Sequence, residues 1–435
     1  MYNRKYDKQA RCGIVLLGMA VLSAPLIAAE RDALFVNEPH LTAANLVQAV
    51  LHRNADIPAM QATWQAAKSR IPMATSFDDP MLSYSVAPQT IDNSEVDFAQ
   101  KITYSQRLPW PGKRDLRGGV ARFEAGAAFE GIEQARLNLT EMAQTSHADW
   151  YYVHAALRIN AINTSLLETF QNIAEIKYSA GYASKQDTLR AELELALLEH
   201  HDIVLERRRR DVLAHLNTLL QRAPDLPLPL PSQLSDPAPL PPIEGLRTLA
   251  LSTHPELRRL AAHQQASRQR ERLAKRDFYP DIDLNIGYNS LRNLDENRFT
   301  IGASINIPLQ GRRDAASDEA RAMTISLNAQ HQGMASQVVG KVQRAYDQVH
   351  ESAHVITLYR QRWLPLAEEN LQAAQSDYEA GSGSFLDLIS VEKKLMQTHL
   401  QLEQTLADYH RNLAALARTV GGEQHLYNTH VEVTP

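Results

Sequence analysis

The residues best suited to chemistry are four potential metal ligands in a row, Glu199-His200-His201-Asp202. Neighbouring residues on a helix point in different directions, so these side chains cannot converge on one ion. The chain has neither a glycine-rich phosphate loop nor a serine nucleophile elbow. Its single cysteine, Cys12, lies near the start. We therefore expect no enzyme activity, no cofactor and no resident metal, and we interpret the four-residue cluster as a surface feature.

Two further carboxylates, Asp187 and Asp387, occupy equivalent places in an internal repeat. The matching landmarks, about 200 residues apart, are Pro80 and Pro280, 108–114 and 307–313, 178–184 and 378–384, and Asp187 and Asp387. Several landmarks in register indicate a duplicated structural unit. Between the copies, residues 224–242 contain eight prolines, which predicts an extended linker.

Charge and the first residues indicate the compartment. The net charge of −5 gives no overall basic field, so we expect no nucleic-acid partner. A basic leader precedes an apolar run at 13–27 and two alanines, which predicts a cleaved signal peptide at 1–29. The alternative is a retained membrane anchor, but the run is shorter than the roughly 20 residues that a spanning helix needs.

Each copy contains two segments that alternate apolar and polar residues with a period of two, which predicts strands with one apolar face. In the first copy the apolar positions are Leu82, Tyr84 and Val86, then Phe98, Ile102 and Tyr104. In the second they are Ile282, Leu284, Ile286 and Tyr288, then Phe299, Ile301, Ala303, Ile305 and Ile307. The turn-rich segment 289–297 is predicted to be a hairpin loop.

Long helices are predicted after each strand pair. Residues 112–180 contain no proline, and 311–380 contain only Pro365. At about 1.5 Å per residue, segments of this length extend roughly 100 Å, too long for a compact domain. We interpret them as coiled-coil helices along a tube. Gly181 and Gly381 end them, and residues 184–220 and 384–420 are predicted to return as shorter helices.

Four amphipathic strands are too few to close a membrane barrel, since the smallest have about eight. An open sheet would leave unpaired edges in lipid, at a cost of several kcal/mol per group. Three chains would supply twelve strands. The strand pattern alone also fits a soluble β-sandwich, with the apolar faces turned inward.

These features together resemble the TolC family of outer-membrane efflux proteins. The similarity rests on the leader, the repeat, the Leu-Pro-Trp-Pro-Gly-Lys-Arg turn at 108–114 and the Tyr-x-x-Gly motifs at Tyr178 and Tyr378, and it extends from about Leu41 to Gly422. The resemblance implies a mainly α fold with membrane β structure: a homotrimer with a 12-stranded outer-membrane β-barrel, four strands per protomer, continuing into a long periplasmic α-helical coiled-coil barrel. It implies four partners: sister chains, outer-membrane lipid, a periplasmic adaptor and an inner-membrane RND transporter.

The resemblance also implies roles at the two helical tips. The periplasmic gate would consist of Asp387, Asp187, Tyr378 and Ser390. Asp387 would lie where the second hairpin narrows the entrance and would select cations, and Ser390 stands where family members often have a second acidic residue, which weakens the acidic ring. Asp187 and Tyr378 would form a latch that holds the entrance closed, or they are ordinary surface residues near a tight turn. The alternative for Asp387 is a solvent-facing helix cap. The positions expected to dock the adaptor are Gly181, Ser184, Leu189, Gly381, Ser384 and Leu388. The strand-to-helix turns are expected at Pro109, Pro111, Gly112, Pro308 and Gly311, where proline ends a ladder and fixes φ.

The expected organisation is a signal peptide (1–29), two repeats joined by a Pro-rich linker, and a tail (423–435). The first repeat (30–222) has short helices, a strand hairpin at about 80–108 and a long helical hairpin at about 112–222. The linker is 223–242. The second repeat (243–422) has a helix, a strand hairpin at about 280–308 and a long helical hairpin at about 311–421.

We expect a passive exit duct in the outer membrane of a Gram-negative bacterium. The tryptophan-containing turn most resembles members of RND-type tripartite pumps for heavy-metal efflux, although many of those carry a lipidated cysteine that this chain lacks. Two alternatives stay open. The same channel could export drugs or polypeptides, or the chain could be an exported coiled-coil structural protein without a pore.

Overall fold

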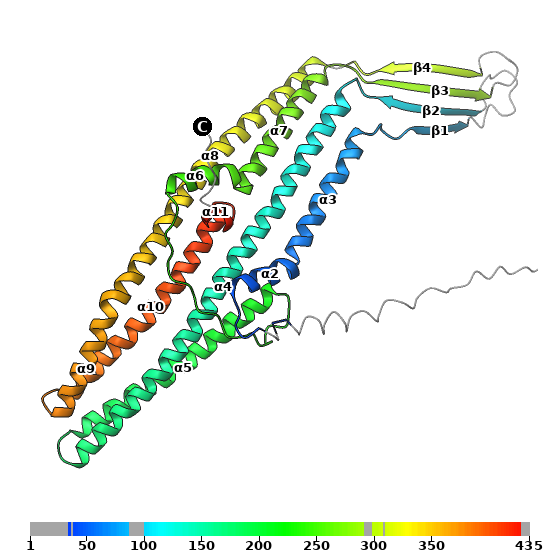
Figure 1. Cartoon of the computed structure of the whole chain (residues 1–435). Coiled ribbons are helices and arrows are strands. Elements are labelled where there is room, and N and C mark those ends of the chain that lie inside the picture. The colour runs from blue at the N-terminus through cyan, green and yellow to red at the C-terminus, as the bar shows by residue number, and fades with distance from the viewer. Residues whose placement is uncertain (1–33, 36–37, 87–99, 291–297, 308, 428–435) are drawn as a thin grey trace, which may run out of the picture.

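The computed structural model describes residues 34–35, 38–86, 100–290, 298–307 and 309–427, and these form an elongated molecule with a sheet at one end and helical tips at the other (Figure 1). The predicted signal peptide at 1–29, Cys12, Phe98 and Pro308 lie outside the described residues. Within the described ranges, no helix combines the length and the apolarity needed to cross a membrane.

One four-stranded sheet unites the strands of both copies. Its strands are β1 (Met81–Val86), β2 (Gln100–Leu108), β3 (Ile282–Ser290) and β4 (Phe299–Ile305). They lie in sequence order, and every neighbouring pair is antiparallel. In the part of the chain that the structure describes, the outer strands β1 and β4 each have one neighbouring strand, so two edges of the sheet are open.

The strand register aligns the predicted apolar faces across the sheet. Leu82 pairs with Tyr104, Tyr104 with Ile286, and Ile286 with Ile301, so that one apolar row crosses all four strands. This row is open to the surroundings: Leu82 is 71% exposed and Ile301 is 86% exposed. A soluble sandwich would bury such a face, whereas none of the described residues covers it.

The predicted loop at 289–297 was wrong at its start. Asn289 pairs with Lys101 and Ser290 with Gln100, so both residues belong to β3. Backbone pairing with β2 continues there despite the turn-forming side chains, because the neighbouring strand supplies partners for the ladder. Residues 291–297 lie outside the described ranges.

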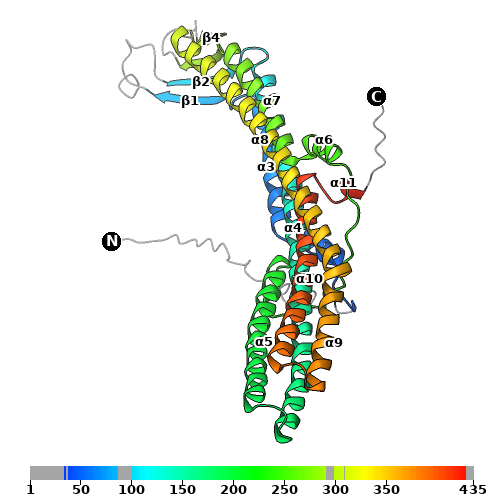
Figure 2. The same ribbon diagram turned by 90° about the vertical axis from the view of Figure 1, so that its left-hand side faces the viewer.

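Helices make up the rest of the molecule. They are α2 (Ala43–Arg53), α3 (Asp56–Thr75), α4 (Lys113–Ser179), α5 (Lys185–Leu219), α6 (Ile243–Thr253), α7 (Pro255–Arg276), α8 (Gln310–Leu358), α9 (Leu364–Ala380), α10 (Phe385–Thr419) and the short α11 (Gln424–Tyr427). The unbroken α4 has 67 residues, a length of about 100 Å. Figures 1 and 2 place the α4–α5 turn and the α9–α10 turn at the same end of the molecule.

The second long helix is interrupted beside its proline. Between α8 and α9 lies one π-helical turn, Tyr359–Trp363, and Pro365 is in the first turn of α9. Proline has no N–H to donate to the preceding turn, and its ring crowds the carbonyl four residues earlier. The wider π turn accommodates this local defect and lets the helix continue.

Three main apolar clusters hold the helices together. One lies between α6, α7, α8 and α10, one between α2, α4 and α5, and one near the tips between α4, α5, α9 and α10. Trp150 and Phe170, both almost completely buried, belong to the second and third clusters. Burying such a side chain stabilises the fold by about 1.5–3 kcal/mol.

The Pro-rich segment between the copies is extended and is packed against the helices. The indole of Trp150 on α4 donates to Pro229 O at 3.0 Å, and Ala238 N donates to the Tyr409 hydroxyl on α10 at 3.1 Å. Leu41 exchanges backbone hydrogen bonds with the same segment. The segment thus ties α4 to α10 as well as connecting the two copies.

Candidate functional site at the helix tips

The first tip reverses the chain between α4 and α5. Gly181 has φ +80°, a left-handed conformation that disfavours side chains with a Cβ. Tyr182 N donates to Lys177 O at 2.8 Å, which closes the end of α4. Ser184 is the N-cap of α5, and Asp187 accepts from Ser184 N at 3.3 Å, forming a capping box.

The second tip repeats this geometry between α9 and α10. Gly381 has φ +81°, and Ser382 N donates to Asp377 O at 3.0 Å. Ser384 Oγ accepts from Asp387 N at 3.1 Å and donates to Asp387 Oδ2 at 2.6 Å. Both copies therefore fold their tips by the same combination of a left-handed glycine and a serine–aspartate cap.

Asp387 has the geometry of the solvent-facing helix cap that the sequence offered as the alternative to a gate. Its carboxylate caps α10 through Ser384, and its side chain is exposed at the extreme end of the chain's fold. Ser390 is also exposed, and its hydroxyl donates to Leu386 O at 2.7 Å. A cap uses part of a carboxylate's hydrogen-bonding capacity, and the charge remains available to solvent.

The two tips touch through a lysine that sequence reasoning missed. Lys177 Nζ, from the first tip, donates to the carbonyls of Tyr378 and Glu379 in the second and lies 4.7 Å from the Tyr378 ring centroid. Burial, and then the nearby charge of Asp187, raise the pKa of Tyr378. Its hydroxyl is buried without a hydrogen-bond partner among the described residues. Asp187 and Tyr378, two of the predicted gate residues, therefore interact electrostatically.

The surface of the tips corrects one predicted docking residue. Leu388 is 1% exposed and packs in the apolar cluster near the tips, because its position on α10 faces the other helices. Leu189, in contrast, is 52% exposed, Leu386 is 50% exposed and Tyr182 is 85% exposed. Gly181, Ser184, Gly381 and Ser384 are exposed as well. Leu386 thus occupies the outward position that was assigned to Leu388.

A buried glutamate, Glu392, lies about two turns from the second tip and was also missed. Glu392 on α10 is 4% exposed, and its Oε1 has no hydrogen-bond partner among the described residues. The neighbouring Lys393 instead pairs with Glu194 of α5 at 2.8 Å. Burial, with a further contribution from Glu194, raises the pKa of Glu392 to about 7. The sequence signal was a glutamate among apolar positions of a helix.

At the other end, the first strand-to-helix turn has a buried ionic network. Gly112 has φ +87° and precedes α4, and Pro109 and Pro111 lie in the turn before it. Lys113 is 2% exposed, and its Nζ lies 2.8 Å from Asp281 Oδ1, next to the start of β3. At the second strand-to-helix turn, α8 begins at Gln310 with the extended Leu309 as its N-cap, so Gly311 is the second residue of the helix, one residue from the predicted start at about 311.

The Asp281 carboxylate is the centre of this network. Besides Lys113, it accepts from Trp110 N at 3.0 Å and from Arg107 at 3.1 Å. Burial opposes its ionisation, but the bonds from Lys113 and Trp110 outweigh burial and lower its pKa. The network fixes the first copy's turn onto the second copy's strand.

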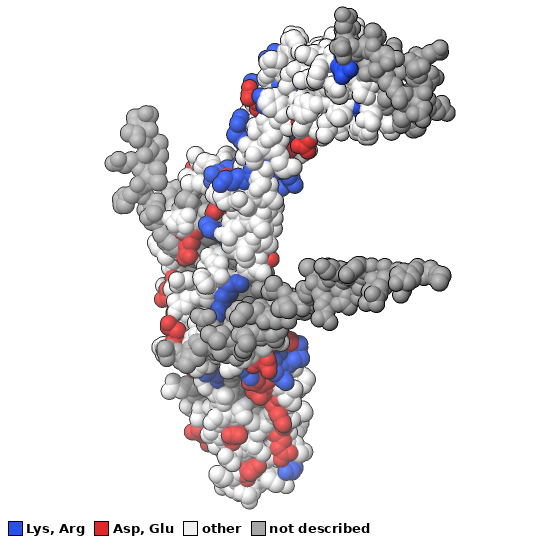
Figure 3. Space-filling model, turned by 90° about the vertical axis from the view of Figure 1, so that its right-hand side faces the viewer, with Lys and Arg blue, Asp and Glu red and all other residues white. Residues whose placement is uncertain are grey.

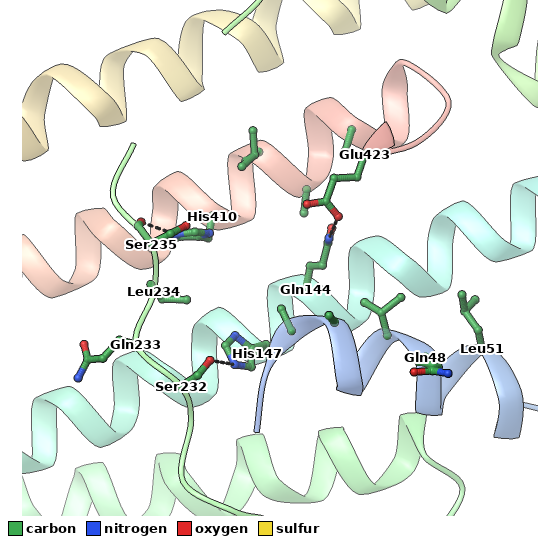
Figure 4. A pocket seen from close by; sticks show the side chains of 16 residues that line it. Gln48, Leu51, Gln144, His147, Ser232, Gln233, Leu234, Ser235, His410 and Glu423 are labelled. Carbon is green, nitrogen blue, oxygen red and sulfur yellow. Dashed lines mark hydrogen bonds between the residues drawn. The ribbon is translucent and has the colours of Figure 1, made fainter. Parts of the chain in front are cut away.

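A cavity of about 600 Å³ lies midway along the molecule, between α2, α4, α10 and the Pro-rich segment (Figure 4). Its two histidines are engaged: His147 bonds Leu41 O at 2.8 Å, and His410 bonds Ser235 O at 2.9 Å. Gln144 donates to Glu423. These bonds hold the Pro-rich segment, Leu41 and Glu423 against the helices, which is a packing role.

The surface charge differs between the two ends of the molecule. On the face in Figure 3, the described sheet end is mostly uncharged, and acidic side chains gather over the helical end. In the part of the chain that the structure describes, no three His, Cys, Asp or Glu side chains are arranged to hold a metal ion. The division matches a sheet in an apolar medium and helices in water.

The fold is that of outer-membrane channel protomers. OprN matches with a TM-score of 0.74 at 18% identity, covering 88% of this chain and 90% of OprN. VceC from Vibrio cholerae also gives 0.74, at 19% identity, covering 87% and 96%. CusC gives 0.73 at 18% identity, covering 87% and 92%.

The sequence comparisons give a family match for the second half of the chain. Residues 246–422 match the family model "Outer membrane efflux protein". Nodulation protein T of Rhizobium leguminosarum bv. trifolii is 21% identical over 324 residues, 71% of this chain and 68% of that protein. Cobalt-zinc-cadmium resistance protein CzcC of Cupriavidus metallidurans is 25% identical over 154 residues, 33% of this chain and 34% of CzcC. The resemblance predicted from the sequence is confirmed to this extent: residues 246–422 match the outer membrane efflux protein family, and the fold of the chain is similar to that of solved outer-membrane channels.

Proposed function

We propose that three copies of this chain form the passive exit duct of a tripartite efflux system for heavy-metal cations. The observation that carries this proposal is the four-stranded sheet with two open edges and an exposed apolar face. With four antiparallel strands, β4 of one copy runs antiparallel to β1 of the next, so identical chains can close a ring of twelve strands. The alternative of a coiled-coil structural protein without a pore does not explain a sheet with open edges and an exposed apolar face.

The helical tips are the proposed entrance and docking end. They lie at the end of the molecule opposite the sheet and expose Tyr182, Leu189 and Leu386. An exposed apolar patch on a helix turn suits a helical partner, here a periplasmic adaptor that links the duct to an inner-membrane RND transporter. Asp387, three times repeated around the axis, would favour cations at the entrance, and Asp187 and Tyr378 would hold it closed.

Single-channel recording in planar bilayers tests the gate. We expect a cation-selective trimeric pore whose preference for cations falls in Asp387→Asn, because three negative charges leave the narrowest point. Asp225→Asn, which removes an exposed charge from the Pro-rich segment, is the matched control and should leave selectivity as in the wild type. Unchanged selectivity in Asp387→Asn would remove Asp387 from the gate.

Metal as cargo is supported by the partial similarity to CzcC and by the tryptophan-containing turn at 108–114. Disruption of the gene is expected to raise sensitivity to cobalt, zinc, cadmium, copper or silver, measured as growth inhibition and reversed by the wild-type gene. If sensitivity rises only to drugs, the proposal of an exit duct is retained and the proposal that it exports metal ions is wrong.

A further inference from the structure

The C-terminal part of α8 carries a metal-binding spacing that was not recognised in the sequence. Residues 350–354 read His-Glu-Ser-Ala-His, so two histidines are four positions apart on one helix. Residues at this spacing are neighbours on the same helical face. The same spacing places both zinc-binding histidines of H-E-x-x-H helices.

The two imidazoles lie side by side on the outward face of α8. Their ring centroids are 4.3 Å apart, and both side chains are exposed. The opposite face is the buried one: Val349 and Ile356 belong to the apolar core, and Ser352 accepts a hydrogen bond from Asn412 of α10. Either histidine can therefore change without disturbing the core.

A backbone contact fixes the protonation of one ring. His354 Nδ1 lies 3.0 Å from His350 O, and a carbonyl can only accept, so Nδ1 carries the proton. In the neutral ring, Nε2 is then left with a free lone pair. Metal-bound histidines are generally oriented in this way, with the second nitrogen donating to a carbonyl or carboxylate.

Negative charge surrounds the pair. Asp347 and Glu351 are exposed on the same side of the helix, and Gln343 donates to both Asp347 oxygens at 2.8 and 2.9 Å. Carboxylates at i, i+4 spacing alongside two imidazoles raise the local concentration of divalent cations and can bind their coordinated waters.

We propose that His350 and His354 form a bidentate site for a divalent transition-metal cation such as Zn²⁺, Cu²⁺, Ni²⁺ or Co²⁺. Imidazole nitrogen is a preferred ligand for these ions, and it is a poor ligand for Mg²⁺ or Ca²⁺. Hydrolytic zinc sites use three protein ligands, and the described residues provide no third side chain here. The site therefore binds a cation without catalysis, and water completes its coordination.

The proposal depends on α8 alone and stands whether or not metal is the cargo of the duct. The full-length chain in detergent is titrated with Zn²⁺ by calorimetry, and with Cu²⁺ by electron paramagnetic resonance. The variants are His350→Gln and His354→Gln. The matched control is the double variant His200→Gln/His201→Gln, which removes two exposed histidines whose adjacent positions cannot chelate.

We expect each single variant to weaken the tightest Zn²⁺ site at least ~10-fold, since a chelate loses its effective-concentration advantage with either ligand. The Cu²⁺ spectrum should change from two coordinated nitrogens to one. The control variant should bind as the wild type. Wild-type affinity in His350→Gln, or an equal loss in the control variant, would overturn the proposal.

Discussion

At the residue scale, the tips show how a duplicated sequence can produce unlike surroundings. Tyr178 and Tyr378 hold equivalent positions in the repeat, yet Tyr178 is 46% exposed and Tyr378 is 5% exposed. Lys177 crosses from the first tip onto Tyr378, whereas the equivalent residue of the second copy is Asp377. Because only the first copy has a lysine at this repeat position, the side chain that links the tips comes from the first copy and contacts the second.

Glu392 gives a pH dependence that can be measured. Its folded pKa of about 7 lies above the ordinary value of 4.5, so the folded state binds the proton more tightly than the unfolded state. Stability is therefore expected to fall as pH rises from about 4.5 through 7 and to level off above, with a total change of roughly 3 kcal/mol. Glu392→Gln should flatten this dependence and raise the unfolding midpoint at pH 8.

Thermal unfolding of the detergent-solubilised protein between pH 5 and pH 8 would measure this effect. The control is Glu192→Gln, which changes the exposed glutamate at the equivalent position of the first copy. That variant should keep the wild-type pH profile. A profile for Glu392→Gln that follows the wild type would show that the carboxylate is already paired or solvated in the assembled protein.

The residue-scale chemistry was only partly predictable from the sequence. Asp187 and Asp387 could be located because the repeat marks their positions, and the left-handed glycines of the tips follow from helix reversal. Leu388 and Leu386 could not be told apart, because the facing of a helix start depends on what packs against it. Glu392 gave no signal beyond its apolar neighbours, and the spacing of His350 and His354 was present in the sequence but overlooked.

At the scale of elements, the junction between β2, α4 and β3 is held by a charge pair with little access to water. Lys113 contacts Asp281 at 2.8 Å and Asp277 at 3.2 Å, and it also donates to Tyr279 O. These bonds connect the end of one repeat's strand to the start of the other's. The junction is therefore where the two copies become one sheet.

Removal of Asp281 alone should lower the free energy of unfolding more than removal of both Asp281 and Lys113. Asp281→Ala leaves the buried Lys113 ammonium short of a carboxylate, and we expect a loss of about 3 kcal/mol in urea unfolding. Adding Lys113→Met to Asp281→Ala should recover most of that loss, because no buried charge remains unpaired. Asp318→Asn, on the exposed face of α8, should change stability by less than about 0.5 kcal/mol. Equal losses in the single and double variants would contradict a role for the ion pair.

The elements themselves were largely predictable, for physical reasons. Period-two alternation identified the strands because one face meets an apolar medium, and the absence of proline identified α4 because nothing breaks its backbone bonds. Strand ends were less predictable: Asn289 and Ser290 stay in β3 because β2 offers them backbone partners. The packing of the Pro-rich segment depends on Trp150 and Tyr409, which lie far from it in sequence.

At the scale of the whole molecule, the open edges of the sheet define how copies should meet. β1 and β4 have unused backbone groups on one side each. Exposed edges of this kind pair with further strands. The sheet thus supplies both the reason for assembly and its geometry.

Cysteine cross-linking tests that geometry. With Ser83→Cys on β1 and Thr300→Cys on β4, oxidation should produce covalent dimers and trimers on denaturing gels, with neighbouring positions tried to find the register. The control pair, Ser105→Cys with Asn285→Cys, faces itself within one chain and should give only monomers. Monomers from every β1–β4 pair tried would argue against closure between sister chains.

The two long arms of the molecule differ in stiffness because only one contains the π turn at Tyr359–Trp363. The continuous α4 has an unbroken series of backbone hydrogen bonds. Between α8 and α9, in contrast, the hydrogen-bond pattern changes at the π turn beside Pro365, and the helix is easier to bend there. Under a lateral force on the tips, the second hairpin would then bend before the first hairpin does. One proline thus gives the two equivalent helical hairpins of the repeat different stiffness.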